Sequence, residues 1–159
     1  MDFCLPPDQL TKVLVTARLI EDAARKGATR RLLEGCNFAL MCEDETTESA
    51  TLFISAIVEM GAHCAHLKPV PPSDGTPEQF LQTVSLLSRL YDAVECQGLA
   101  AGFVADLARH ASVPVYDGLA GSDHPIARWA SMAAPHPGGA IDHKVALQAV
   151  LINALEDRC

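Results

Sequence analysis

The sequence has 159 residues, a formal net charge of −8 and a hydrophobic content of 49%. Its length fits one domain with a substantial core, and its apolar content argues against an unfolded chain. Because basic residues are few and form no cluster, we expect no nucleic-acid partner. Because no run approaches roughly 18 apolar residues, we expect no membrane span.

Apolar residues at helical spacing alternate with short apolar runs along the chain. Helices are expected at residues 7–25, 47–61, 77–90, 99–111, 123–133 and 142–156, with a short helical turn at 30–35. Strands are expected at residues 38–42, 63–68, 93–96 and 113–116. Pro114 favours an edge position for the last strand. Strands that alternate with helices predict an α/β fold, a three-layer α/β/α sandwich with a four-stranded parallel sheet.

The cysteines show neither a Cys-x-x-Cys pair nor regular spacing; they are Cys4, Cys36, Cys42, Cys64, Cys96 and Cys159. We expect reduced thiols, because three of them fall in predicted strands, where cysteine packs as a small hydrophobic residue. The N-terminal residues have neither the basic nor the apolar region of a signal peptide, so a cytoplasmic location is expected.

No metal or cofactor is expected from the sequence. His63 and His66 are three residues apart on a predicted strand, so their side chains point to opposite faces and are poorly placed to share a metal. Trp129 is expected to pack against the core rather than to bind a ligand.

The loop between the first strand and the second helix lies where α/β folds place their ligands. Its residues Thr46, Thr47 and Ser49 offer hydroxyl groups and amides at a helix start, which is a common anion site. Four acids crowd the same turn: Glu43, Asp44, Glu45 and Glu48. They should repel a phosphate. The alternative interpretation is that they cap the helix and favour its dipole.

The strand-loop-helix-strand unit over residues 37–69 resembles the signature region of the aspartate/ornithine carbamoyltransferases. In that family a Ser-Thr-Arg-Thr-Arg loop opens the helix and cradles the phosphate of carbamoyl phosphate. The aligned residues 46–50 read Thr-Thr-Glu-Ser-Ala, so both arginines are replaced. Residues 112–119 resemble the family segment Ser-Val-Pro-Val-x-Asn-Gly-Leu, and residues 124–127 resemble His-Pro-x-Gln. The likeness extends over residues 8–133.

The resemblance implies a set of ligand-binding positions: Thr46, Thr47, Glu48, Ser49, Ala50, Gln97, His124 and Ala127. Gln97 stands where the family has an arginine that polarises the carbamoyl carbonyl group. His124 matches a histidine that points at the carbamoyl oxygen, although a histidine before proline is also a common helix cap. Ala127 replaces a glutamine. The loop at residues 71–77 resembles one that reaches a neighbouring subunit's site, but it carries no lysine or arginine.

Residues 142–156 resemble the last helix of the full carbamoyltransferases, which returns from the second domain to pack on the first. A linker of residues 134–141 joins this helix to the preceding segment. The resemblance therefore implies one carbamoyl-phosphate domain over residues 1–159, with the amino-acid-binding domain absent.

These replacements favour a non-catalytic protein that acts by association, either as a homo-oligomer, with a trimer favoured, or with an intact transcarbamoylase. One alternative is a binding domain for a neutral or cationic small molecule at the ancestral site. The other is a residual carbamoyltransferase that uses a partner's second domain.

Overall fold

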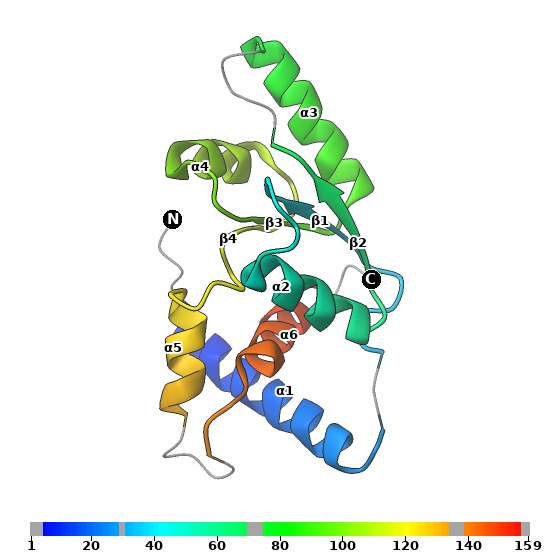
Figure 1. The fold of residues 1–159 in the computed structure, drawn as a ribbon, viewed down its shortest axis with the longest axis vertical. Coiled ribbons are helices and arrows are strands. Elements are labelled where there is room, and N and C mark those ends of the chain that lie inside the picture. Colours follow the sequence, from blue (N-terminus) through cyan, green and yellow to red (C-terminus); the bar gives the residue numbers. More distant parts are fainter. Residues whose placement is uncertain (1–4, 29–30, 70–74, 134–138, 157–159) are drawn as a thin grey trace.

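The computed structural model describes residues 5–28, 31–69, 75–133 and 139–156. Figure 1 shows its elements. The helices are α1 Pro7–Arg25, α2 Glu48–Glu59, α3 Pro77–Leu90, α4 Ala101–His110, α5 Pro125–Met132 and α6 His143–Ala154. The strands are β1 Asn37–Met41, β2 His63–Leu67, β3 Ala93–Cys96 and β4 Val115–Asp117.

The sheet is parallel throughout and has the order β2-β1-β3-β4. This confirms the predicted four-stranded parallel sheet. It also confirms the edge position of β4, although this strand begins at Val115 rather than at residue 113. Proline has no N–H to donate to a neighbouring strand, and Pro114 instead accepts a bond from the amide of Val94 just before β4 begins.

Helices cover both faces of the sheet, as the sandwich prediction requires (Figure 1). Successive side chains of β1 alternate between the two faces. Phe38 and Leu40 pack into a core shared with α1, α2, α5 and α6, whereas Ala39 and Met41 pack with α3 and α4. Phe38 meets Phe53 of α2 edge to face, with ring centroids 5.9 Å apart. Trp129 of α5 packs against the first of these cores, as expected.

The predicted helices are confirmed, and α2 and α6 each begin one residue later than expected because Thr47 and Asp142 are caps. Thr47 caps α2 by accepting from the amide of Ala50 at 3.1 Å. Thr76 and Gln79 form a reciprocal capping box at the start of α3. In place of the expected helical turn at 30–35, residues 32–35 form a turn. Residues 29–30 and most of the loop at 71–77 lie outside the described residues.

Helix α6 lies among α1, α2 and α5 and buries residues on nearly all its sides. The Gln148 amide nitrogen donates to the carbonyl oxygen of Ala56 at 2.9 Å inside this packing. At the start of α6, Lys144 pairs with Glu59 of α2 at 2.7 Å. These contacts make α6 part of the folded core.

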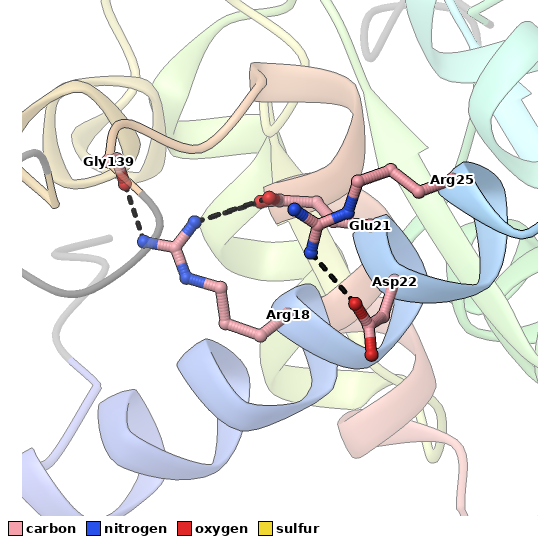
Figure 2. A network of polar contacts seen from close by, with 5 residues as sticks. All are labelled: Arg18, Glu21, Asp22, Arg25 and Gly139. Carbon is pink, nitrogen blue, oxygen red and sulfur yellow. Dashed lines mark hydrogen bonds and ion pairs between the residues drawn. The ribbon is translucent and has the colours of Figure 1, made fainter.

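The chain entering α6 is attached to α1 by Arg18. Its Nη1 atom lies 3.1 Å from Oε1 of Glu21 on the same helix, and its Nη2 atom donates to the carbonyl oxygen of Gly139 (Figure 2). The figure also shows Arg25 paired with Asp22 one turn further along α1, at 2.8 Å. Arg18 thus fixes the backbone just before α6 begins.

The cysteines differ in part from expectation. Cys42, Cys64 and Cys96 are free thiols, and burial raises the pKa of Cys64 to about 11 and that of Cys96 to about 12. Cys36, however, is disulfide-bonded, so the expectation that all six thiols are reduced is wrong. Sequence spacing gave no sign of this bond, because a disulfide depends on which thiols the fold brings together. In the part of the chain that the structure describes, no helix is long and apolar enough to cross a membrane.

Candidate functional site

The candidate site lies at the carboxyl ends of β1 and β3. These two strands are neighbours, and the chain leaves β1 toward β2 on one side and β3 toward β4 on the other. Such a change of direction opens a crevice at the strand ends, where doubly wound α/β proteins bind ligands. The register places Met41 of β1 beside Cys96 of β3, and Cys96 beside Asp117 of β4. The loops that follow these residues therefore meet.

In the loop after β1, the acids bond to the chain itself. The Asp44 carboxylate accepts from the amide of Thr46 at 2.8 Å and from the Thr46 hydroxyl group at 2.5 Å. These two hydrogen bonds hold the pKa of Asp44 below its ordinary value. The Asp44 carboxylate therefore occupies the Thr46 amide and hydroxyl donors, which could otherwise bind a phosphate.

His66 of β2 holds the same loop from the side. Its Nε2 atom lies 2.8 Å from the carbonyl oxygen of Cys42, and its Nδ1 atom lies 3.4 Å from Oε2 of Glu45. His63 is exposed at the start of β2. No group of three or more potential metal ligands occurs among the described residues.

The expected ligand positions on α2 are not all accessible. Thr46, Thr47 and Glu48 are exposed and Ser49 is partly buried. The Ala50 side chain is fully buried in the core, and its amide donates to Thr47. A long cationic side chain at position 50 would not fit this packing without rearrangement.

Gln97 follows β3 and reaches the start of α2. Its Nε2 atom donates to the carbonyl oxygen of Ser49 at 3.2 Å and to Oε2 of Glu95 at 3.3 Å. Its Oε1 atom is buried and has no hydrogen-bond partner among the described residues. The amide nitrogen of Gln97 therefore donates within the protein, and only its amide oxygen, an acceptor, is left for another group.

Glu95 is a site residue that the sequence analysis missed. Its side chain is fully buried on β3, where Oε1 accepts from the Leu119 amide at 3.0 Å and Oε2 from the Ala120 amide at 3.1 Å. Burial raises the pKa of Glu95 to about 7, against the effect of the hydrogen bonds it accepts. A lone carboxylate in the apolar strand at residues 93–96 was the available signal, since buried acids are rare unless paired.

His124 caps α5, as the alternative interpretation of this residue predicted. Its Nδ1 atom accepts from the amide of Ile126 at 3.1 Å, which leaves the ring proton of the neutral form on Nε2. Burial, followed by the nearby His143, lowers the pKa of His124 and favours this neutral form. Ala127 lies in the first turn of the same helix and is partly buried.

The segment between β4 and α5 joins these groups. Leu119 and Ala120 bond to Glu95 through their amides, and His143 of α6 lies 3.4 Å from the carbonyl oxygen of Leu119. The fold therefore brings the starts of α2, α5 and α6 to the ends of β1, β3 and β4. This arrangement is that of a doubly wound α/β domain, and no lysine or arginine occurs in the chain from the start of β1 to the end of β2.

Comparison with known proteins identifies the family. The model of the aspartate/ornithine carbamoyltransferase carbamoyl-phosphate-binding domain matches residues 4–133. The catabolic ornithine carbamoyltransferase of Mycoplasma capricolum subsp. capripneumoniae is 32% identical over 119 residues, covering 75% of this chain and 38% of that protein. This chain belongs to the aspartate/ornithine carbamoyltransferase family and corresponds to its carbamoyl-phosphate-binding domain.

Solved structures agree with this assignment. Ornithine carbamoyltransferase from Pyrococcus furiosus matches with a TM-score of 0.61 and 28% identity, over 70% of this chain and 36% of that one. A mitochondrial ornithine carbamoyltransferase from Coccidioides immitis matches with a TM-score of 0.65 and 22% identity, over 88% and 45%. The latter likeness shows the fold alone. The chain spans less than half the length of each of these relatives.

Proposed function

We propose that this chain is a non-catalytic member of the transcarbamoylase family that acts by associating with itself or with an intact transcarbamoylase. One observation carries the proposal: donor groups at the ends of β1 and β3 are bonded to acceptors of the chain itself. Asp44 accepts from Thr46. Gln97 donates to Ser49 and Glu95. A phosphate would have to displace these contacts.

The charge at the same place supports the proposal. Glu48 is the first residue of α2, where the family motif has an arginine, and Glu43 and Glu45 are exposed in the preceding loop. No lysine or arginine occurs between residues 37 and 67. The helix dipole attracts an anion, but these carboxylates repel it, so the local balance is against phosphate.

We also propose that α6 is the returning helix of the family, joined to α5 by a short connection in place of an amino-acid-binding domain. Helix α5 ends at Met132 and α6 begins at His143, and α6 packs against α1, α2 and α5. Transfer of a carbamoyl group needs a site that presents the amine close to carbamoyl phosphate. A connection of this length leaves no room for such a domain at this place in the chain.

Calorimetric titration with carbamoyl phosphate tests the loss of the ligand. We expect no saturable heat from the protein at millimolar ligand. Glu48→Arg should introduce weak binding, because it removes a negative charge and places a cation at a helix start. Glu78→Arg makes the same charge change in the first turn of α3, outside the site, and should introduce none. Saturable heat from the unchanged protein would contradict the proposal and favour residual carbamoyltransferase activity with a partner.

Exposed apolar side chains on α1 and α3 give two surfaces at which association can be tested. Large hydrophobic residues that stay exposed are Val15, Leu19, Leu32, Val58, Leu81, Leu86, Leu90 and Met132. Val15 and Leu19 are four residues apart on α1, and Leu86 and Leu90 have the same spacing on α3, so each pair lies on one side of its helix. Scattered exposed apolar side chains are normal on protein surfaces, so these two pairs serve only to mark two helix faces where an interface can be tested.

Sedimentation velocity tests association. We expect a species heavier than the 17.0 kDa chain, with a trimer favoured, or co-sedimentation with an intact transcarbamoylase. Leu19→Glu on α1 and Leu86→Glu on α3 change two exposed surfaces separately, so loss of assembly in only one variant locates the interface. Sedimentation as a monomer at every concentration, both alone and in the mixture, would exclude the proposal.

The main alternative is a binding domain with a changed ligand. The exposed carboxylates of the loop after β1 favour a neutral or cationic molecule over an anion. A thermal shift caused by such a molecule, with no response to carbamoyl phosphate, would favour this function over association.

A further inference from the structure

We propose that Glu95 and Gln97 form a proton-controlled link at the crevice, which holds the start of α2 while Glu95 is ionised and releases it when Glu95 takes up a proton. The link does not depend on whether the chain acts by association or by binding a ligand. Three features carry it: the buried carboxylate of Glu95, the Gln97 amide nitrogen that donates to two acceptors, and the Gln97 amide oxygen that has no partner among the described residues.

The first element of the link is the environment of Glu95. Its carboxylate accepts three N–H groups, from Leu119, Ala120 and Gln97, at 3.0, 3.1 and 3.3 Å. All three partners are donors, which suits an ionised carboxylate. Full burial opposes ionisation, because the charge has lost its water. The three donors favour the charged form of Glu95 and burial favours the neutral form. Protonation therefore changes the hydrogen bonds that the carboxyl group can make.

The second element is the amide of Gln97. Its nitrogen is shared between Glu95 and the carbonyl oxygen of Ser49, 48 residues earlier in the chain. Its oxygen is buried without a partner among the described residues. A buried unpaired acceptor costs stability, and here it lies on the same amide group that contacts the carboxylate.

Proton uptake offers that oxygen a donor. When Oε2 of Glu95 binds one proton from solvent, its new O–H group needs an acceptor, and the Gln97 amide can supply Oε1 by turning about its terminal bond. The same turn moves Nε2 away from Ser49. The turn also breaks the hydrogen bond from Nε2 to Oε2 of Glu95, which the new O–H···Oε1 bond replaces, while the Ala120 amide stays on the remaining lone pair of Oε2. The carboxyl group keeps the Leu119 amide on Oε1 throughout, so the segment before α5 stays attached while the start of α2 is released.

The neighbouring titratable groups come from every adjoining strand and helix end. Asp117 of β4 acts on the charge of Glu95 directly, and Glu95 in turn acts on the thiols of Cys42 and Cys96. On the helix side, His124 is influenced by His143, Asp123 and Asp117. The burial that raises the pKa of Glu95 to about 7 places its proton exchange near neutrality. Histidine side chains in general exchange protons in the same pH range, so the experiment must distinguish a histidine transition from that of Glu95.

Nuclear magnetic resonance of the ¹⁵N-labelled protein tests the link. We expect the side-chain amide signals of Gln97 and the backbone amides of Leu119 and Ala120 to shift together, with one shared midpoint near the value of about 7 for Glu95. The titration should extend over about two pH units on each side of that midpoint. A Gln97 side chain that does not respond over this range overturns the proposal, and this result needs only the unchanged protein.

Three variants identify the group that titrates. Glu95→Gln should abolish the shared transition. His124→Asn, which keeps a good helix cap, and His143→Asn should leave its midpoint in place. If instead the transition disappears in either histidine variant, Glu95 is not its source and the proposal is wrong. Should Glu95→Gln fail to fold, Gln97→Ala replaces it: the Leu119 and Ala120 amides should still titrate, while the amide of Ser49 and its neighbours in α2 should no longer respond.

Discussion

Replacing Leu151 with alanine should lower the free energy of unfolding by about 2–5 kcal/mol. Leu151 is fully buried on α6, in the core that α6 shares with α1, α2 and α5. The substitution removes buried methyl groups and leaves a cavity that neighbouring side chains fill only in part. Because single domains are stable by about 5–15 kcal/mol, a loss of this size is easily measured by urea unfolding followed by circular dichroism.

A matched leucine provides the control. Leu86 of α3 is 54% exposed, and Leu86→Ala should change the free energy of unfolding by less than about 0.5 kcal/mol. If both substitutions had the same small effect, α6 would not be a stabilising part of this domain. The proposal that it is the returning helix of the family would then lose its structural support.

Glu95→Gln should remove a pH dependence of about 3 kcal/mol from the free energy of unfolding. In the unfolded chain Glu95 ionises near its ordinary pKa of 4.5, whereas in the folded protein burial raises its pKa to about 7. Below the lower value both states are protonated, and the contribution of Glu95 to stability is fully present. As the pH rises from there to about 7, only the unfolded state loses its proton, so this contribution is lost.

The observable is the difference in unfolding free energy between the unchanged protein and Glu95→Gln, measured by urea unfolding at several pH values. This difference should fall as the pH rises through the range from 4.5 to about 7 and stay level above it. Glu43→Gln, at an exposed acid of the loop after β1, is the matched control and should show a much smaller trend, because water solvates that carboxylate in both states. A flat difference for Glu95→Gln would show that the folded protein keeps Glu95 ionised down to its ordinary range.

The order and type of the elements could be predicted because their signals are local. Helical spacing of apolar residues marks α1 and α3, and short apolar runs mark β1 and β3. The alternation of strands and helices requires long crossovers, and these make the sheet parallel. Pro114 placed the last strand at an edge for an equally local reason, since proline cannot donate to a neighbouring strand.

The candidate site could be predicted only in outline. The loop at residues 46–50 and the residues Gln97 and His124 do lie at adjoining strand and helix ends, but whether a ligand contacts them stays a prediction. The capping role of His124 followed from the proline after it. The burial of Ala50 did not follow from the loop motif, because one turn of helix places its side chain in the core rather than in the crevice.

The sequence by itself determined the class of fold, the parallel sheet, the acidic character of the loop after β1 and the likeness to the transcarbamoylases. Each depends on residue types read over a few neighbouring positions. Only the tertiary structure decided the bonds that join distant segments: Glu95 to Leu119 and Ala120, Gln97 to Ser49, and His66 to Cys42. A hydrogen bond needs its two atoms within about 3 Å, and only the packing of strands and helices sets that distance between residues far apart in the chain.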